Sequence, residues 1–363
     1  MSNEIRKIEI WMGDCQVGNM GLTRDNLCAF EYTSEWLQNG FSISPFELPL
    51  TPGLKIAQRR PFDGGFGVFD DSLPDGWGRL ILARYLETQG VRVGELNILQ
   101  QLCLVGTNGR GALEFRPDQS VVGTEEYLNF SKLAAETEAI LSSESYTGQS
   151  LKELVRRGGS PGGARPKIFI VDEDGEWMVK FRAKYDSKDI GKVELRYAEL
   201  AQKCGIEMMP CRLFDGKYFG TQRFDRQHGT RQHVISAAGL LCADYRDPCL
   251  DYRHIFQLTS YLTHSMAELW RVYRLMCFNV LIGNKDDHAK NFAFLYDEGW
   301  KLSPAYDLLP SDGMNGYHTT SINDSITPQK EDLLALAKAF SLNEIKAESI
   351  YHEMAESVKA ISF

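Results

Sequence analysis

The sequence predicts an α+β fold built as a β-rich lobe followed by a helical lobe. Residues 1–115 mix short strand-like pieces with a helical stretch, which predicts a separate α+β unit. Two pairs of strand-like segments, each joined by an Asp-Gly turn, lie between residues 167 and 224. From about residue 235 onward strand signals fade and helical periodicity dominates. A chain of 363 residues is expected to form two or three packed units.

The N-terminal part alternates strand and helix signals. Strands are predicted at residues 5–13, 53–58 and 64–69, and helices at residues 76–90 and 127–141. A turn-rich stretch, DSLPDGWGR, covers residues 71–79, and the sequence does not indicate its role. The glycine-rich stretch RRGGSPGGARPK, residues 156–167, cannot continue a helix.

The remaining elements follow from local signals. Strands 167–171 and 177–182 flank the turn pair Asp174-Gly175, and strands 211–214 and 218–224 flank Asp215-Gly216. The helix predicted between the hairpins, residues 193–205, ends at Gly205. The clearest helix covers residues 265–284, where Ser265 and Glu268 have capping-box spacing and Gly283 is placed to end the helix.

Charge and composition exclude several functional classes. The net charge of -9 provides no global positive field for non-specific binding to nucleic acid or to an anionic membrane. The eight cysteines contain no C-x-x-C pair, which favours buried reduced thiols over a zinc site or disulfides. Neither a signal peptide nor a membrane-spanning run is seen, so we expect a cytoplasmic protein.

Two features of the β-rich lobe each have two interpretations. The glycines of residues 158–163 lack Cβ atoms, so their backbone N–H groups could approach a polyphosphate, but glycine clusters also serve as linkers. Lys180 either faces solvent on an edge strand or points inward to contact phosphates. In the second case a carboxylate of the following helix would hold it, with Glu194 the natural candidate and Glu199 its rival.

The segment GNKDDHAKNFAF, residues 283–294, carries the strongest chemical signal. Asp286 and Asn291 have the spacing D-x-x-x-x-N, which phosphoryl-transfer enzymes use to orient a hydroxyl and bind a divalent metal. Asp307 follows the strand-like WKLS and supplies a second carboxylate that could reach the same metal. The alternative, a solvated turn at residues 286–288, leaves the order of Asn291 and Asp307 unexplained.

Together these motifs resemble the HipA family of bacterial toxin kinases. The resemblance covers most of residues 70–325 and includes SLPDGWGR, NGRGALEF, GGSPGGARPK, WMVKF, QRFDR, DDHAKNF and SPAYDL. It implies a protein-kinase-like bilobal fold, transfer of phosphate from ATP to Ser or Thr of protein targets, and a small DNA-binding antitoxin as partner. The implied division is a HipA-type N-terminal subdomain (1–115), a helical connector with the nucleotide-binding small lobe (116–225), and a helical catalytic lobe (226–363).

The resemblance also assigns roles to individual residues. It implies that Asp286 is the catalytic aspartate, assisted by Lys180 and His288, and that Asn291 and Asp307 bind Mg²⁺. Gln222 and Phe224 fall where the family meets adenine, and Ser160 where it is autophosphorylated and thereby switched off. The full set implied to bind ATP is Ser160, Gly162, Gly163, Ala164, Lys180, Glu194, Gln222, Phe224 and Lys290.

The D-x-H-x-x-N pattern differs from the H-R-D-x-x-x-x-N of ordinary protein kinases. We expect His288 either to hydrogen-bond the Asp286 turn or to contact the γ-phosphate, and Lys290 to do either or to face water. Asp287 is expected to be a solvated neighbour of Asp286.

Three functional hypotheses follow. The first is an ATP- and Mg²⁺-dependent Ser/Thr kinase toxin that phosphorylates a translation component, such as an aminoacyl-tRNA synthetase. The second is a catalytically weak kinase-like corepressor that binds an antitoxin on operator DNA, although all three metal and catalytic positions are present. The third is a metal-dependent nuclease, which would not need a glycine loop and an inward lysine. Nucleic acid is expected to be contacted only through the antitoxin, and a membrane not at all.

Overall fold

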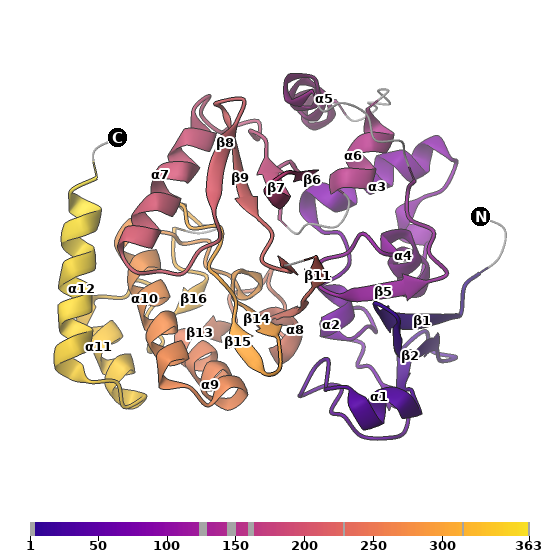
Figure 1. Cartoon of the computed structure of the whole chain (residues 1–363), viewed down its shortest axis with the longest axis horizontal. Coiled ribbons are helices and arrows are strands. Elements are labelled where there is room, and N and C mark those ends of the chain that lie inside the picture. Colours follow the sequence, from indigo (N-terminus) through magenta and orange to yellow (C-terminus); the bar gives the residue numbers. More distant parts are fainter. Residues whose placement is uncertain are drawn as a thin grey trace. The chain divides into compact units, whose positions relative to one another are not determined.

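The structure is a computed structural model that describes residues 4–122, 129–143, 150–158, 163–227, 229–313 and 316–361. Its contacts divide the chain into two compact units. Unit 1 comprises Met1–Lys192 and Cys211–His233, and unit 2 comprises Val193–Pro210 and Val234–Phe363. Each unit contains both helices and strands (Figure 1), which confirms the α+β class. The predicted three-part division of the chain stays a prediction.

A five-stranded antiparallel sheet forms the N-terminal part of unit 1. Its order is β4-β3-β2-β1-β5, with β1 Lys7–Met12, β2 Cys15–Leu22, β3 Cys28–Tyr32, β4 Lys55–Ile56 and β5 Leu113–Arg116. In β1 the side chains of Ile8 and Ile10 are buried while those of Lys7 and Glu9 are exposed, the alternation of a half-buried strand. The strand predicted at residues 5–13 is therefore confirmed.

The strand predicted at residues 64–69 is wrong. Residues Gly67–Asp70 form the short helix α2, and the Glu47 carboxylate accepts a hydrogen bond from the Gly67 N–H at 2.7 Å. Val68 and Phe69 are adjacent and both buried. In such a short apolar run, periodicity alone cannot distinguish a buried helical turn from a buried strand. The other unit 1 helices are α1 Ser34–Asn39, α3 Gly76–Thr88, η1 Val93–Glu95, α4 Ile98–Val105, α5 Phe130–Ser142 and α6 Leu151–Gly158.

A second antiparallel sheet of unit 1 has the order β6-β7-β9-β8. Its strands are β6 Lys167–Asp172, β7 Gly175–Lys180, β8 Cys211–Phe214 and β9 Tyr218–Gln222. Asp215 and Gly216, the predicted turn pair, both have positive φ, 48° and 66°, and residues 215–217 connect the paired strand ends Phe214 and Tyr218. A small ribbon of β10 Arg226–Gln227 and β11 Thr230–Arg231 follows.

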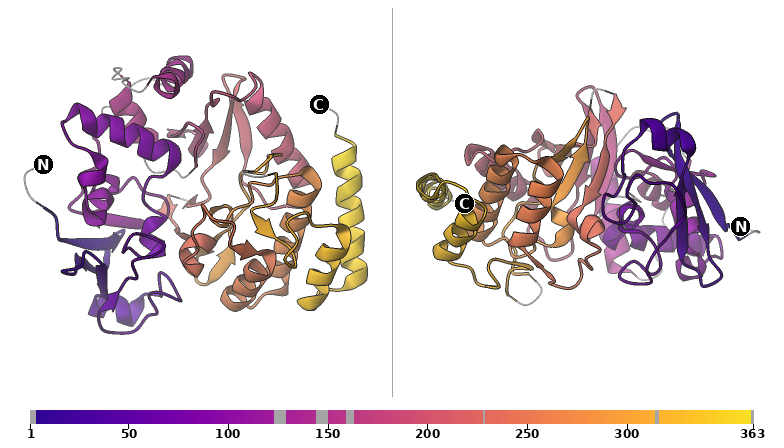
Figure 2. Two further views of the ribbon diagram at one scale, coloured as in Figure 1. Left: turned by 180° about the vertical axis from the view of Figure 1, so that it is seen from behind. Right: turned by 90° about the horizontal axis from the view of Figure 1, so that it is seen from below.

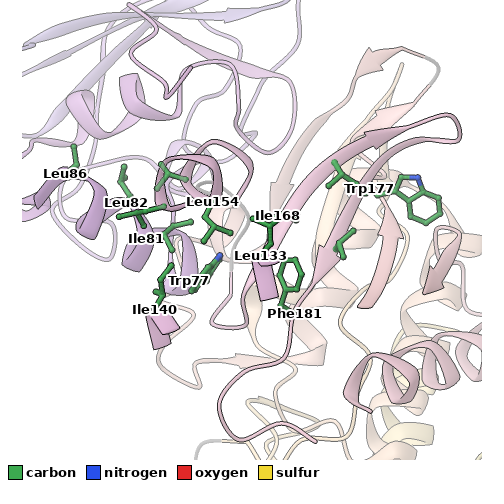
Figure 3. Close-up of a cluster of buried hydrophobic side chains, with 14 of the residues drawn as sticks. Trp77, Ile81, Leu82, Leu86, Leu133, Ile140, Leu154, Ile168, Trp177 and Phe181 are labelled. Carbon is green, nitrogen blue, oxygen red and sulfur yellow. The ribbon is translucent and has the colours of Figure 1, made fainter. Parts of the chain in front are cut away.

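Helix α3 shares an apolar core with this second sheet (Figure 3). Trp77, Ile81 and Leu82 of α3 are buried together with Leu154 and Val155 of α6. From the β6–β7 hairpin, Ile168, Val179 and Phe181 complete the same cluster. The hairpin that carries Lys180 is therefore packed on a helix from the first 115 residues.

A buried ion cluster also joins the two sheets of unit 1. The carboxylate of Asp225, 4% exposed, accepts hydrogen bonds from Arg223 at 2.8 Å, Arg226 at 2.9 Å and the Gly111 N–H at 2.7 Å. Arg231 donates to the Gly111 carbonyl at 3.0 Å. Burial alone would raise the pKa of Asp225, but the charges and hydrogen bonds of Arg223 and Arg226 hold it well below its usual range.

Asp225→Asn is expected to lower the free energy of unfolding by about 3 to 5 kcal/mol, since it leaves buried guanidinium groups without their counter-charge. A depressed carboxyl pKa stabilises the fold above the ordinary Asp value of 3.8, and this contribution is lost as the pH falls below it. Urea unfolding of both proteins should show a constant gap from pH 8 to pH 5 that narrows only toward pH 4 and below. Asp215→Asn is the control, because Asn tolerates the positive φ of that turn. Equal stability of the Asp225 variant and wild type at pH 7 would contradict this role.

Helices dominate unit 2. Helix α10 packs against α9, α11 and α12 (Figure 2). The Ser265 hydroxyl caps α10 by accepting from the Glu268 N–H at 3.4 Å, but the Glu268 carboxylate bonds Leu302 and Arg271, so only half of the predicted capping box forms. The helices are α7 Ile190–Lys203, which begins in unit 1, α8 Ala237–Leu241, α9 Tyr252–Thr263, α10 Met266–Ile282, η2 Ala289–Asn291, α11 Lys330–Ala339 and α12 Glu344–Lys359.

Unit 2 also contains strands that the sequence indicated only weakly. β12 His233–Ser236, β14 Ala293–Tyr296 and β15 Trp300–Leu302 form a three-stranded sheet, and β13 Leu250–Asp251 pairs with β16 Thr320–Ser321. The strand-like WKLS is confirmed as part of β15. The antiparallel β14–β15 hairpin lies between Asn291 and Asp307 in the sequence. In the part of the chain that the structure describes, no helix combines the length and apolarity needed to cross a bilayer.

Candidate active site

The strongest predicted segment begins where helix α10 ends. Gly283 adopts φ 69°, so the chain leaves the helix in the left-handed conformation that glycine tolerates best. Asn284 follows directly, 3% exposed, and forms a parallel bridge to Ser311. The turn that the sequence predicts at Gly283 therefore directs residues 284–291 away from the helix axis.

Asp286 and Asn291 lie next to each other on this loop. Asp286 is exposed, and the Asn291 side-chain amide donates a hydrogen bond to the Asp286 carbonyl at 2.7 Å. Because a carbonyl can only accept, the amide nitrogen must face Asp286, and the amide oxygen points the other way. Asn291, the last residue of the 3-10 turn Ala289–Asn291, thus has its amide oxygen directed away from the Asp286 carbonyl.

Asp307 is held against the same loop by its backbone neighbours. Its carbonyl accepts a hydrogen bond from the Asn284 amide at 3.3 Å, and the Tyr306 hydroxyl donates to the Lys290 carbonyl at 2.6 Å. Asp307 has φ 59°, a conformation that Asp and Asn adopt more readily than most residues. The segments that carry Asp286, Asn291 and Asp307 are therefore hydrogen-bonded to one another.

Asp287 is not the solvated neighbour that the sequence analysis expects. It is 0% exposed, and its carboxylate accepts hydrogen bonds from His318 Nδ1 at 3.0 Å, Thr319 N at 3.0 Å and Thr320 N at 3.2 Å. The Thr320 hydroxyl also donates to the Asp287 carbonyl. The first Asp of the pair is exposed and the second anchors the loop to residues 318–320.

A buried polar chain connects this anchor with Asp307. The Tyr252 hydroxyl is hydrogen-bonded to Asp287 and accepts from the Asn279 amide at 2.9 Å, and Asn279 in turn accepts from Asn284 at 3.0 Å. Burial, together with the nearby negative charge of Asp287, raises the pKa of Tyr252 well above its usual range, so its hydroxyl stays protonated. These buried hydrogen bonds therefore connect residues 284–287 of the loop with helices α9 and α10.

His288 and Lys290 contribute to the shape of the loop. His288 Nδ1 accepts from the Lys290 N–H at 3.2 Å and caps the 3-10 turn, and the imidazole packs on Tyr245 with ring centroids 5.8 Å apart. The Lys290 ammonium lies 4.2 Å from the centroid of the Tyr245 ring. Hydrogen bonding of His288 within the turn, one of its two expected roles, is observed; a contact with phosphate stays a prediction.

In unit 1, Lys180 is not on the solvent face of an edge strand. Strand β7 pairs with β6 on one side and β9 on the other, and Lys180 is 6% exposed. Its ammonium lies 5.7 Å from the Phe219 ring centroid, and its charge helps to lower the pKa of Asp186. The inward orientation is therefore the one observed. Of the two carboxylates proposed to hold it, Glu194 is buried at 7% and Glu199 is exposed.

Asp186, which the sequence did not indicate, pairs with Arg165, one of the cationic residues that flank the glycines of residues 158–163. Burial alone would raise the pKa of Asp186, but hydrogen bonds from Arg165 at 3.0 and 3.1 Å and from the Ala183 N–H, with the charge of Lys180, lower it overall. The Arg165–Asp186 pair therefore fixes the residues just after the glycine-rich stretch. Two residues 21 apart give no sequence signal for such a pairing.

The remaining predicted nucleotide-binding residues of unit 1 fall in three places. Ser160 and Gly162 lie outside the described residues. Gly163 and Ala164 are described, and Gly163 has φ 94°. Gln222 ends β9 opposite Trp177, with its side-chain amide donating to the Asp174 carbonyl at 2.8 Å, and the Phe224 ring lies 5.6 Å from the Arg110 guanidinium carbon.

The donor chemistry of unit 2 fits a magnesium ion. Mg²⁺ binds carboxylate and amide oxygens and keeps several waters, so one carboxylate from Asp307 and one amide oxygen from Asn291 suffice when phosphate oxygens complete the shell. Among the described residues no cluster of three or more His, Cys, Asp and Glu side chains could hold a metal ion. The fit thus depends on an amide ligand and on a bound nucleotide.

Comparison with known proteins adds a family match. The family model of the HipA N-terminal domain matches residues 8–116, and the model of the HipA-like C-terminal domain matches residues 159–361. The serine/threonine-protein kinase toxin HipA of Shewanella oneidensis is 24% identical over 364 residues, covering 88% of this chain and 79% of that protein. Y4dM of Sinorhizobium fredii, named as a kinase, is 26% identical over 335 residues, covering 85% of this chain and 79% of that protein.

A solved structure matches nearly the whole chain. A chain of the Shewanella oneidensis complex of HipA, HipB and operator DNA matches with a TM-score of 0.73 at 20% identity, covering 97% of this chain and 88% of that one. At this level of identity the match bears on the fold, and it confirms the predicted kinase-like α+β architecture.

Proposed function

The chain belongs to the HipA family, and we propose that it is an ATP- and Mg²⁺-dependent serine/threonine protein kinase. We propose further that it is the toxin of a toxin–antitoxin system, that its target is a cytoplasmic translation component such as an aminoacyl-tRNA synthetase, and that it autophosphorylates Ser160. The observation that carries the kinase proposal is the hydrogen-bonded assembly of the segments that carry Asp286, Asn291 and Asp307.

The chemistry assigns one task to each residue. Asp286 accepts the proton of the Ser or Thr hydroxyl as its oxygen attacks the γ-phosphorus, and ADP leaves with the bridging oxygen. Lys180 contacts the phosphates. Gly163, Ala164, Gln222 and Phe224 contribute to binding the nucleotide, as do Ser160 and Gly162. His288 and Lys290 shape the loop around Asp286 and are candidates for contact with phosphate.

Asn291 and Asp307 would hold Mg²⁺, which neutralises charge on the transferred phosphoryl group when it is bound. Two contacts support this proposal: the Asn291 amide nitrogen bonds the Asp286 carbonyl, which leaves the amide oxygen to act as a ligand, and the Asp307 carbonyl is hydrogen-bonded to the same loop through Asn284. The two ligands come from either side of the β14–β15 hairpin.

A small DNA-binding antitoxin is the proposed partner. The similar HipA of Shewanella oneidensis occurs in a complex with HipB and operator DNA. The net charge of -9 on this chain does not favour direct non-specific contact with DNA, so we assign operator binding to the partner.

Calorimetric titration tests the nucleotide-binding part of the proposal. ATP with Mg²⁺ is expected to give saturable heat with the wild-type protein, and Asp307→Asn is expected to weaken binding by about tenfold or more by removing a charged ligand. Asn tolerates the positive φ of Asp307, so the variant tests the ligand rather than the backbone. Asp297→Asn is the matched control, because Asp297 is exposed and its carboxylate forms an ion pair with the exposed Lys301. Wild-type protein without saturable heat would favour the corepressor hypothesis instead.

A further inference from the structure

The segment Asp75-Gly76-Trp77 contacts Gly163, at the end of the glycine-rich stretch. The Asp75 carboxylate accepts a hydrogen bond from the Gly163 N–H at 2.5 Å. The Trp77 N–H donates to the Gly163 carbonyl at 3.1 Å. Both peptide groups of Gly163 are therefore bound by one short segment of the N-terminal 115 residues.

Gly76 allows this close approach. It has φ 41°, and a Cβ atom built on it would lie 2.5 Å from the Gly163 carbonyl oxygen and 2.9 Å from the Ala164 Cα. Real Cβ contacts do not occur at such distances, and the atoms met are backbone atoms that cannot rotate away. Any side chain at residue 76 would push residues 163–164 out of place.

Trp77 of the same segment also lies close to Gly158, the last residue of α6. A Cβ atom on Gly158 would lie 2.5 Å from the Lys167 carbonyl oxygen and 3.3 Å from Trp77 Nε1. Trp77 is 1% exposed and packs in the core with Leu154 and Ile168 (Figure 3), and its Nε1 has no hydrogen-bond partner among the described residues. Gly158 and Gly163 are thus both placed by contacts with residues 75–77.

These contacts extend to the lysines of the β6–β7 hairpin. A Cβ atom on Gly163 would lie 2.8 Å from Lys167 Nζ, and Lys167 is the cross-strand partner of Lys180. Both lysines are buried, at 4% and 6% exposed. Gly163 therefore lies beside the Lys167 ammonium, on the strand that pairs with the one carrying Lys180.

We propose that Asp75, Gly76 and Trp77 are positioning residues for ATP binding. They hold Gly163 and Ala164 beside Lys167, so that these described groups are preorganised for the phosphates, which lowers the ordering cost of binding. The inference rests on the proposed function, and it gives the HipA N-terminal domain, residues 8–116, a direct part in nucleotide binding. It also assigns a role to the DSLPDGWGR stretch.

The test compares four variants of the full-length protein by calorimetric titration with ATP and Mg²⁺. Asp75→Ala removes the hydrogen bond to the Gly163 N–H, and Gly76→Ala displaces residues 163–164 by a steric clash. Each is expected to raise the dissociation constant of ATP by about tenfold. Asp75→Asn keeps an acceptor oxygen for the Gly163 N–H and is expected to stay within about twofold of wild type. Gly94→Ala is the matched control, because a Cβ there meets nothing within 4 Å.

Hydrogen exchange gives a readout that is independent of activity. The peptide containing Gly163 is expected to exchange faster in Asp75→Ala than in Asp75→Asn or wild type, since the carboxylate no longer protects its N–H. If Gly76→Ala does not fold, the two Asp75 variants still decide the question. ATP binding by folded Asp75→Ala as tight as wild type overturns the inference. Wild-type protein that binds no ATP at all overturns the proposed function and this inference with it.

Discussion

Asp286→Asn is expected to reduce phosphate transfer from ATP by about 10²- to 10⁴-fold, the usual contribution of a general base. The substitution keeps the size of the side chain and removes the group that accepts the hydroxyl proton. Asp286 is exposed on a loop whose shape is set by Asp287 and Asn291, so the fold is expected to be unchanged. Transfer of label from γ-labelled ATP, measured on both purified proteins, checks the first part.

The stability of the Asp286 variant is the control for this experiment. Its urea unfolding midpoint is expected to match wild type, so that a loss of transfer reports chemistry and not folding. Undiminished transfer by the variant would remove Asp286 from the catalytic role.

Asp287→Asn, unlike Asp286→Asn, is expected to destabilise the fold, lowering the free energy of unfolding by about 3 to 5 kcal/mol. The buried carboxylate accepts from His318, Thr319 and Thr320, and an amide would turn an NH₂ group toward one of these donors. We therefore expect the exposed carboxylate of Asp286 to be needed for phosphate transfer and the buried carboxylate of Asp287 to be needed for stability.

Equilibrium unfolding in urea measures this difference, with Asp286→Asn as the matched isosteric control one residue away. A wild-type free energy of unfolding for Asp287→Asn would show that its hydrogen bonds contribute nothing net. Full stability in the Asp287 variant together with lost stability in the Asp286 variant would reverse the assignment.

Local signals in the sequence predicted local structure well. Gly205 and Gly283 end helices in the left-handed conformation, and the Asp215-Gly216 pair forms a hairpin turn as expected. The reason is that a helix end or a two-residue turn is decided by the residues that form it. The D-x-x-x-x-N spacing likewise brings Asn291 to Asp286 within one short loop.

The features that the sequence did not predict depend on residues that are distant along the chain. The donors that bury Asp287 are 31 to 33 residues away in sequence. The sequence left two orientations open for Lys180, because the strand that pairs with the second edge of β7 is β9, some 40 residues later. The contact between Asp75 and Gly163 spans 88 residues, and nothing in DSLPDGWGR alone indicates it. Such pairings appear only once the chain is folded.

We propose that this chain transfers phosphate from ATP to Ser or Thr of another protein. The most direct measurement is the phosphoproteome of cells after a pulse of wild-type protein, compared with a pulse of Asp286→Asn at the same level. We expect one or a few Ser or Thr sites, in a translation component, to gain phosphate only with wild type. Identical phosphoproteomes from the two pulses would contradict it.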